Sequence, residues 1–370
     1  MSGTNTQTDS FAKSPAKPPL RDGRAFVALD GLRGVAAITI TVLHAHYFFP
    51  SLSINANLAV DFFFALSGFV LAHAYGEPLR KSLSASRFML IRLVRLYPLY
   101  FFGLVICLPF GMHWLALGYP ASTIVINTAT AVFFLPSPVT TLELYPLNPP
   151  AWSLFFELVA NTCLGFFGAP SGKVTLCATM AFPALALVLG TFWFGPLIGG
   201  DTWSGFWAGA IRVSYSFQAG ILTYRIWQTR KPNIRLPAPA LGFLLLVLLL
   251  MQPSPFYERY FAVCAVLFLF PLLVWFGAEC EPRGSIATAC RWLGATSYAL
   301  YILHYPMLFY AGYLAPRFLS PDASRWPWGV LFVASALAIA DVGNRIDQPV
   351  RRLLYSFFAE TKHSMRKFSR

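Results

Sequence analysis

Apolar runs long enough to cross a lipid bilayer are the feature that most constrains this chain. A helix needs about 20 apolar residues to span the hydrocarbon core. Runs close to that length occupy residues 26–49, 56–76, 88–111, 152–169, 174–195, 205–228, 237–252, 259–278, 292–315 and 328–350. Because 56% of the residues are hydrophobic and only 12% are charged, the chain lacks the polar surface of a soluble domain. The sequence therefore predicts an all-α, polytopic transmembrane helix bundle of about ten spans.

A shorter apolar run at residues 121–136 decides the expected topology. If this run does not cross, 20 of the 28 Lys and Arg residues lie on the side of both termini, and the opposite loops hold only Arg259, Arg317 and Arg325. If it does cross, the later loops change sides and 10 basic residues face 13. Because basic residues concentrate on the cytoplasmic side, we expect both termini in the cytoplasm and a re-entrant or interfacial segment near 121–136. The expected location is the cell inner (plasma) membrane.

Charge and cysteine usage exclude several other classes of protein. The basic loops account for the net charge of +13, which favours contact with anionic membrane lipids and predicts no nucleic-acid partner. The six cysteines are scattered without the spacing of a metal site, so no metal is expected. We divide the chain into a polar, disordered cytoplasmic tail at 1–25, a transmembrane domain at 26–352 and a basic cytoplasmic tail at 353–370.

Five arginines remain inside the expected spans, where a charge is costly unless it has a partner or a task. Arg33, Arg92 and Arg95 fall at similar depth in the inner halves of their spans, with Arg92 and Arg95 on one helix face. An anion between them would relieve their repulsion, and the planar guanidinium group suits phosphate. The alternative is that each arginine reaches the headgroups or pairs with an acid such as Asp30. For the three together we favour an anion site.

The outer halves of the expected spans carry two imidazoles and two carboxylates, namely His44, Asp61, Glu157 and His304. At comparable depth, these groups can form a general base whose tautomer is fixed by an acid, as proton removal from a hydroxyl requires. His44 follows Arg33 by eleven residues, or roughly 16 Å along a helix. The alternative is that the four groups only join helices through hydrogen bonds. Both Asp61 and Glu157 stand as candidate partners of His44.

Aromatic residues accompany these groups. Tyr298 and Tyr301 recur every three residues and share a helix stripe with His304, so both are candidate substrate contacts. Trp152 is a third candidate, although its position at the start of a span favours an interfacial anchor over a ligand contact.

With their flanking residues, these positions resemble the acyltransferase 3 family of integral membrane acyltransferases, whose members modify polysaccharides, O-antigen, other glycans and some natural products. The resemblance extends from about residue 26 to 352. It rests on residues 29–34 followed by His44, and on the motifs at 60–69, 92–98, 150–157 and 297–306. One motif departs from the family: where many members have Glu-Lys-Pro, this chain has Asp347, Gln348 and Pro349, which keeps the acid and loses the base.

The resemblance implies transfer of an acyl group, usually acetyl, from cytoplasmic acyl-CoA to a hydroxyl of a glycan-like acceptor at the outer face. Arg33, Arg92 and Arg95 would bind the phosphates of coenzyme A, and His44 would act as general base or carry the acyl group covalently. Acetyl-CoA or another acyl-CoA is then the donor substrate, and no permanently bound cofactor is expected. Two alternatives stay open: a transporter of an anionic solute or lipid-linked glycan, and a succinyl or longer-acyl transferase of the same fold.

Overall fold

The computed structural model describes residues 24–368, apart from 53, 141, 171, 196–198 and 319–323. Within these residues the chain is helical and has no β-strand, although an isolated antiparallel bridge joins Glu143 to Thr202. The helices are α1 (Val27–His44), η1 (Ala56–Leu58), α2 (Ala59–Lys81), α3 (Ala85–Ala116), α4 (Ala121–Val132), α5 (Ala151–Phe167), α6 (Lys173–Phe194), α7 (Phe206–Thr229), α8 (Ala238–Leu250), α9 (Pro255–Cys264), η2 (Ala265–Leu269, a π-helical turn), α10 (Phe270–Glu279), α11 (Gly284–Phe318) and α12 (Trp326–Phe368).

Each predicted apolar run holds a helix, and the chain is a multi-pass membrane protein. Six segments among the described residues are both long and apolar enough to cross a bilayer, namely Val27–His44, Ala56–Lys81, Ala85–Ala116, Lys173–Trp193, Pro255–Glu279 and Trp326–Phe358. The apolar helices α4, α5 and α8 are shorter. Helices α7 and α11, of 24 and 35 residues, have the length to cross but carry more polar side chains.

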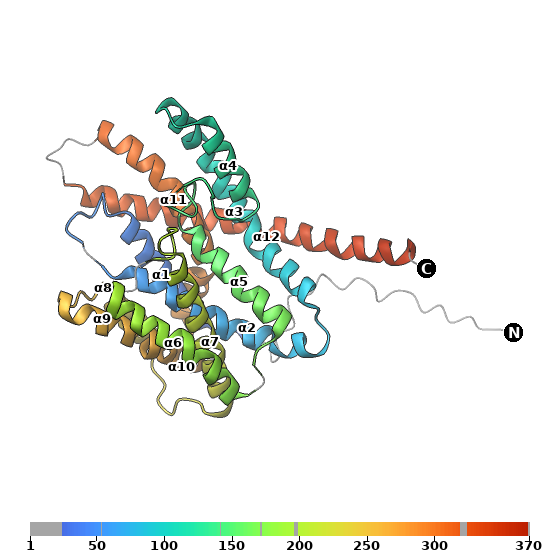
Figure 1. The fold of residues 1–370 in the computed structure, drawn as a ribbon. Coiled ribbons are helices and arrows are strands. Elements are labelled where there is room, and N and C mark those ends of the chain that lie inside the picture. Colours follow the sequence, from blue (N-terminus) through green and yellow to red (C-terminus); the bar gives the residue numbers. More distant parts are fainter. Residues whose placement is uncertain are drawn as a thin grey trace.

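Helix α4 covers the short run that decides the topology. Its 12 residues extend about 18 Å, well below the ~30 Å of a hydrocarbon core. The hydroxyls of Tyr97 and Tyr100 on α3 donate to the carbonyl oxygens of Val132 and Ala131, so the end of α4 lies beside the middle of α3. Figure 1 shows the two helices side by side. Helix α4 therefore folds back along α3.

Two close helix contacts fix the positions of the polar side chains. Helix α1 packs along α11, where a Cβ added to Gly294 would lie 2.4 Å from the Cβ of Asp30. Helix α2 crosses α7 at Gly68 and Gly220, and a Cβ on either glycine would lie 2.0 Å from a backbone oxygen of the other helix. Small residues allow backbones to approach this closely in membranes. Each helix pair is therefore held in one register.

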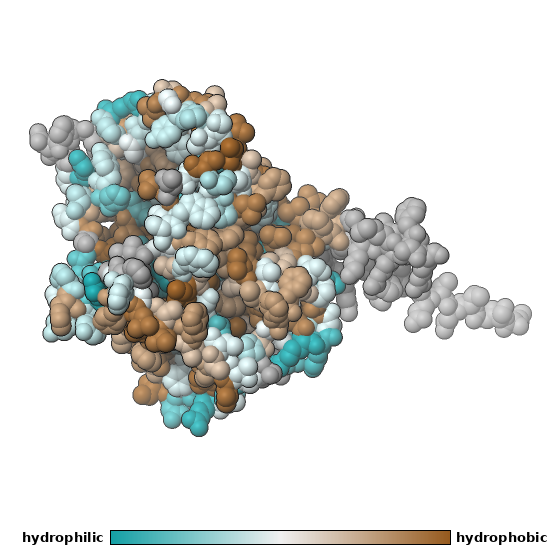
Figure 2. All heavy atoms as spheres, in the orientation of Figure 1, coloured by the Kyte–Doolittle hydropathy of each residue, from teal (hydrophilic) through white to brown (hydrophobic). Residues whose placement is uncertain are grey.

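The outside of the bundle is apolar, and its interior holds charge. On α6, the side chains of Val174, Phe182 and Trp193 are 84%, 77% and 83% exposed. Figure 2 shows hydrophobic residues, in brown, over much of the visible face. By contrast, the charged side chains of Asp61 and Arg212 are buried between helices. The apolar surface suits contact with lipid, and the buried polar groups need partners or a function.

The two predicted tails differ in what the structure shows. Helix α12 continues without a break past residue 352 to Phe368, and Figure 1 shows it projecting from the bundle. The segment predicted as a basic tail is thus helical over 353–368. The amino-terminal tail predicted at 1–25 lies outside the described residues, except for Arg24 and Ala25.

Candidate active site

Two histidines from distant parts of the chain meet inside the bundle. His44 is the last residue of α1, and His304 lies in α11 and is fully buried. The Nδ1 of His44 lies 2.7 Å from the Nε2 of His304, a hydrogen-bond distance, and the two rings are nearly parallel. Both histidines were predicted site residues, and the packing of α1 on α11 brings them together.

The hydrogen bonds of this pair determine where its protons lie. The Nδ1 of His304 lies 3.0 Å from the carbonyl oxygen of Leu300, which only accepts hydrogen bonds, so this nitrogen carries a proton. In a neutral ring, the Nε2 of His304 is then an acceptor, and the Nδ1 of His44 must donate to it. The Nε2 of His44 is left with a free lone pair and has no partner within the described part of the chain. His44 is thus presented as a base.

Neither predicted carboxylate orients His44. Asp61 forms a buried ion pair with Arg212, at 2.7 Å, and accepts a hydrogen bond from Ser216. Glu157 forms an ion pair with Arg92, also at 2.7 Å, and accepts a hydrogen bond from Ser67. Each acid is thus neutralised by an arginine from another helix, as a desolvated carboxylate requires. The place expected for an acid beside His44 is taken by His304.

Arg212 joins the Asp61 carboxylate to two segments of backbone. Its Nη1 donates to the carbonyl oxygen of Gly199 at 2.7 Å, and its Nη2 donates to that of Asn57 at 2.8 Å. The guanidinium group also lies over the ring of Trp152, 5.5 Å from its centroid. All three guanidinium nitrogens therefore bind protein groups, and the Arg212–Asp61 pair holds α2, α7 and the 199–201 segment together.

The predicted aromatic contacts are used within the protein. The hydroxyl of Tyr301 lies 2.7 Å from Ser153 Oγ, and that of Tyr298 donates to the carbonyl oxygen of Leu96. Trp152 is 8% exposed and packs on Arg212, so it is not at the lipid interface. These contacts clamp the part of α11 that carries His304 against α3 and α5.

Tyr305 and two connecting segments border the histidine pair. The ring of Tyr305 meets that of His44 edge-on, with centroids 5.4 Å apart, and lies within electrostatic range of Glu143 and Asp201. The segments that hold these two acids pair with each other, since the backbone nitrogen of Leu144 donates to the carbonyl oxygen of Asp201 at 2.7 Å. Burial, and next the charge of Asp201, raise the pKa of the Glu143 carboxyl. Acidic groups therefore lie near the His44 end of the bundle.

The predicted arginine cluster lies toward the other end of α1. Arg33 donates from Nε to Ser297 and from Nη2 to Asp30 and to the carbonyl oxygen of Gly294, at 2.7–2.9 Å. It therefore joins α1 to α11. It also pairs with Asp30, as in the alternative in which each arginine pairs with a buried acid. Arg95 lies within electrostatic range of Arg33.

The arginines of α3 keep unused hydrogen-bond donors. Arg92 binds Glu157 through Nη2, but its Nε is buried without a partner among the described residues. Arg95 is exposed and has no hydrogen-bond or ion-pair partner in the same residues. Asp347 and Arg351 of α12 form an ion pair at 2.6 Å, and both lie within electrostatic range of Arg95. The structure thus places spare cationic donors where the sequence predicted an anion site.

Several residues with defined contacts were not singled out as site residues from the sequence. The hydroxyl of Ser67 donates to Glu157 at 2.8 Å. Ser153 binds Tyr301, and the fully buried Asn148 donates to the carbonyl oxygen of Ile302 at 3.0 Å. A usable signal existed only for Arg212, since a buried arginine requires an acid at its own depth. No cluster of three or more His, Cys, Asp or Glu that suits a metal occurs in the part of the chain that the structure describes.

The helical bundle thus holds a hydrogen-bonded pair of histidines and, about three helical turns away along α1, a group of arginines. These features define the protein as a candidate membrane enzyme. Comparison with known proteins identifies the family. The profile of the acyltransferase 3 family, described as an acyltransferase domain, matches residues 26–345. The chain belongs to this family.

A curated relative covers about half of the chain. It is "Protein 2 in picA locus" of Rhizobium radiobacter, which is 39% identical over 187 residues; the match spans 46% of this chain and 95% of the relative. No solved structure matches the chain.

Proposed function

We propose that this protein is a membrane-bound O-acyltransferase that moves an acyl group, acetyl in the first instance, from acyl-CoA to a hydroxyl of a carbohydrate or other glycan-like acceptor. Membership of the family supports acyl transfer. The observation that carries the proposal is the free Nε2 of His44, which the hydrogen bonds from His44 through His304 to Leu300 leave unprotonated. A lone pair presented in this way suits removal of a proton from a hydroxyl.

In the proposed reaction, the Nε2 of His44 takes the proton of the acceptor hydroxyl as its oxygen attacks the thioester carbonyl. The carbon–sulfur bond then breaks, and the leaving thiolate of coenzyme A takes the proton back from His44. Throughout, the Nδ1–H of His44 donates to His304, which favours the charged imidazolium. His304 acts as a positioning residue, and Asp61 and Glu157 position the surrounding helices through their ion pairs.

The donor's phosphates would bind at the arginine cluster. Arg92 Nε and the whole of Arg95 are spare donors, and charge-assisted hydrogen bonds to phosphate are strong. Arg33 lies eleven residues before His44 on a continuous helix, or roughly 16 Å along its axis. A donor bound at the arginines must therefore extend over that distance to bring its thioester to His44. This arrangement suits a donor with phosphates at one end and a thioester at the other.

For the topology, we propose ten crossings, both termini in the cytoplasm and a location in the cell inner membrane. The distribution of basic residues and the short, folded-back α4 support this arrangement. Acyl-CoA would then bind from the cytoplasm and the acceptor from the outer face.

The test is equilibrium binding of acetyl-CoA to the purified protein in detergent. We compare wild type with Arg92→Gln/Arg95→Gln, and use Arg87→Gln, an exposed arginine on the same helix, as the matched control. Loss of charge-assisted phosphate contacts should weaken binding about tenfold to a thousandfold in the double variant and leave the control unchanged. Absence of binding by folded wild-type protein would contradict the donor, and solute flux without release of coenzyme A would favour a carrier.

A further inference from the structure

A second cluster of cationic side chains surrounds a cavity that the proposed reaction does not use. The cavity has a volume of about 300 Å³ and lies between the carboxyl ends of α2, α5 and α7. Phe26 packs on His73 and Trp227, with ring centroids 4.9 and 5.5 Å apart, which places the cavity near the Val27 end of α1. It therefore opens at the end of the bundle opposite to His44.

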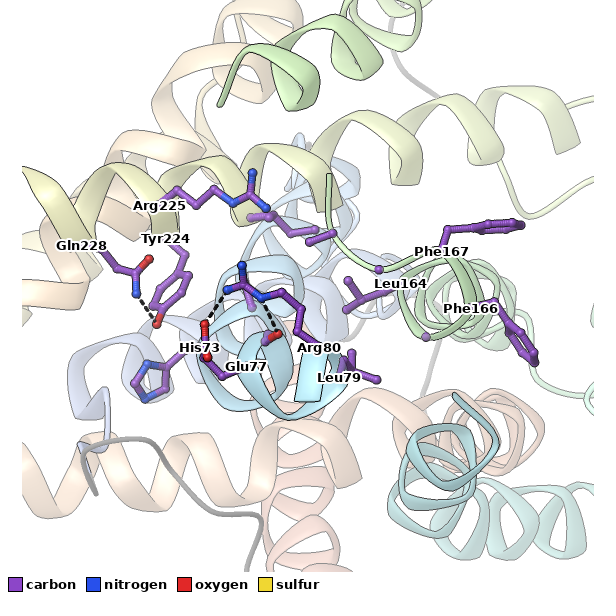
Figure 3. Close-up of a pocket in the computed structure, with 16 residues that line it drawn as sticks. His73, Glu77, Leu79, Arg80, Leu164, Phe166, Phe167, Tyr224, Arg225 and Gln228 are labelled. Carbon is purple, nitrogen blue, oxygen red and sulfur yellow. Dashed lines mark hydrogen bonds and ion pairs between the residues drawn. The ribbon is translucent and has the colours of Figure 1, made fainter. Parts of the chain in front are cut away.

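Two arginines from different helices line this space. Figure 3 shows Arg80 of α2 and Arg225 of α7 on facing sides of it, near the Tyr224–Gln228 pair. Arg80 is held by Glu77 at 2.7 Å and by the carbonyl oxygen of Gly76. Its side chain is 64% exposed, so the guanidinium group is accessible to a ligand at the mouth of the cavity.

The charges around the cavity do not cancel. Arg225 is held by the carbonyl oxygens of Gly172 and Pro170, which carry no net charge. Glu77 is shared between Arg80 and Lys81, with the Lys81 ammonium at 3.0 Å. Among the described residues that line the cavity, the two arginines meet one carboxylate, Glu77, which also pairs with Lys81 outside the lining. An anion in the cavity would relieve the repulsion between the two arginines.

The rim of the cavity is apolar and exposed. Phe166 and Phe167, at the end of α5, are 65% and 87% exposed, and Figure 3 shows both rings pointing away from the cavity. At the end of an apolar helix, such rings suit the boundary between hydrocarbon and headgroups. A ligand here would meet positive charge inside and lipid chains at the rim, a combination that suits an anionic lipid better than a water-soluble nucleotide.

We propose that this cavity binds the phosphate headgroup of an anionic phospholipid, with Arg80 and Arg225 as the phosphate ligands and the acyl chains lying against Phe166 and Phe167. The lipid would belong to the leaflet at the Val27 end of α1. The site is separate from the histidine pair and does not depend on the acyl-transfer reaction.

The test is titration of the purified full-length protein with phosphatidylglycerol, with bound lipid counted by native mass spectrometry. Phosphatidylcholine, which has a phosphate but no net charge, serves as the comparison lipid. Arg80→Gln should weaken phosphatidylglycerol binding about tenfold. Arg87→Gln, which removes an exposed charge outside the cavity, should leave it unchanged.

Two results would overturn the proposal. One is equal phosphatidylglycerol affinity in Arg80→Gln and wild type, when both proteins have the same melting temperature. The other is displacement of phosphatidylglycerol by coenzyme A that depends on Arg80, which would assign the cavity to a nucleotide. Arg225→Gln is the secondary variant, because Arg225 also holds the backbone at 170 and 172.

Discussion

Half-buried His44 and buried Arg212 both make polar contacts, but they differ in how completely these contacts use their hydrogen-bonding groups. Every guanidinium nitrogen of Arg212 binds a protein group. His44 has a partner for Nδ1 and none for Nε2 within the described residues. A side chain whose hydrogen-bonding atoms all bind protein groups holds helices together. A side chain with one such atom unused can bind a substrate.

The same contrast separates the arginines near the other end of α1. Arg33 makes three hydrogen bonds to protein groups. Arg95 makes none to the residues that the structure describes. Substitution of satisfied groups should therefore reduce stability, and substitution of unsatisfied groups should reduce activity or binding.

The largest expected effect is on catalysis by His44. Replacement by alanine should reduce release of coenzyme A from acetyl-CoA in the presence of acceptor by about 10²–10⁴-fold, since that is the usual contribution of a general base. The melting temperature should change little, because only one hydrogen bond to the rest of the protein is lost. His46→Ala, an exposed neighbour, is the control. Equal rates in the two variants would remove His44 from the mechanism.

The next largest effect is on stability at the Asp61–Arg212 pair. Asp61→Ala leaves Arg212 buried without its carboxylate and should lower the free energy of unfolding by about 3–5 kcal/mol. The double variant Asp61→Leu/Arg212→Met should recover much of this loss, because no charge is left unpaired. Thermal unfolding in detergent measures both. If the double variant is as unstable as the single one, the other contacts of Arg212 matter more than its charge.

A smaller effect should distinguish Arg33 from Arg95. Arg95→Gln should weaken acetyl-CoA binding about tenfold without a change in melting temperature, because it removes a donor that no protein group uses. Arg33→Gln should lower the melting temperature, since it loses contacts with Ser297 and Gly294 on α11. The two variants are compared by isothermal titration and by thermal unfolding. The reverse pattern would show that Arg33, rather than Arg95, is the donor ligand.

The smallest effect is a pH dependence at Glu143. Burial and the Asp201 charge raise the pKa of this carboxyl in the folded protein, so its ionisation there is less favourable than in the unfolded chain. The stability linked to Glu143 is fully present below its unfolded pKa and is lost as pH rises through its folded pKa. Glu143→Gln should therefore raise the melting temperature at pH 8 and have little effect at pH 4. A shift that is the same at both pH values would contradict this origin.

Much of the fold was predictable from sequence because apolar length is a local property. The apolar runs and the short segment at 121–136 needed no information on contacts. His44 could be singled out for a similar reason, since an imidazole near the end of an apolar helix is costly without a function, and its catalytic role stays a prediction. His304 was also a candidate, but its direct hydrogen bond to His44 was not predictable, because the two are 260 residues apart and meet only through the packing of α1 on α11.

The partners of the two acids were also outside the reach of sequence analysis. Asp61 and Glu157 are drawn to Arg212 and Arg92, and the pairing follows from the lateral order of the helices. That order depends on small residues such as Gly68, whose importance appears only when the opposing helix is known. The catalytic roles predicted for these acids remain predictions.

The crossing at Gly68 and Gly220 has a mechanical consequence. Because the backbones approach closely at this crossing, α2 and α7 have no side-chain layer there that could deform, which opposes sliding of one helix past the other at this point. An opening that admits a donor or releases a product is therefore expected away from this crossing. Helix α4 offers such a place. It is short, its end contacts α3 through the hydroxyl of Tyr97, and the described residues between α4 and α5 form no helix.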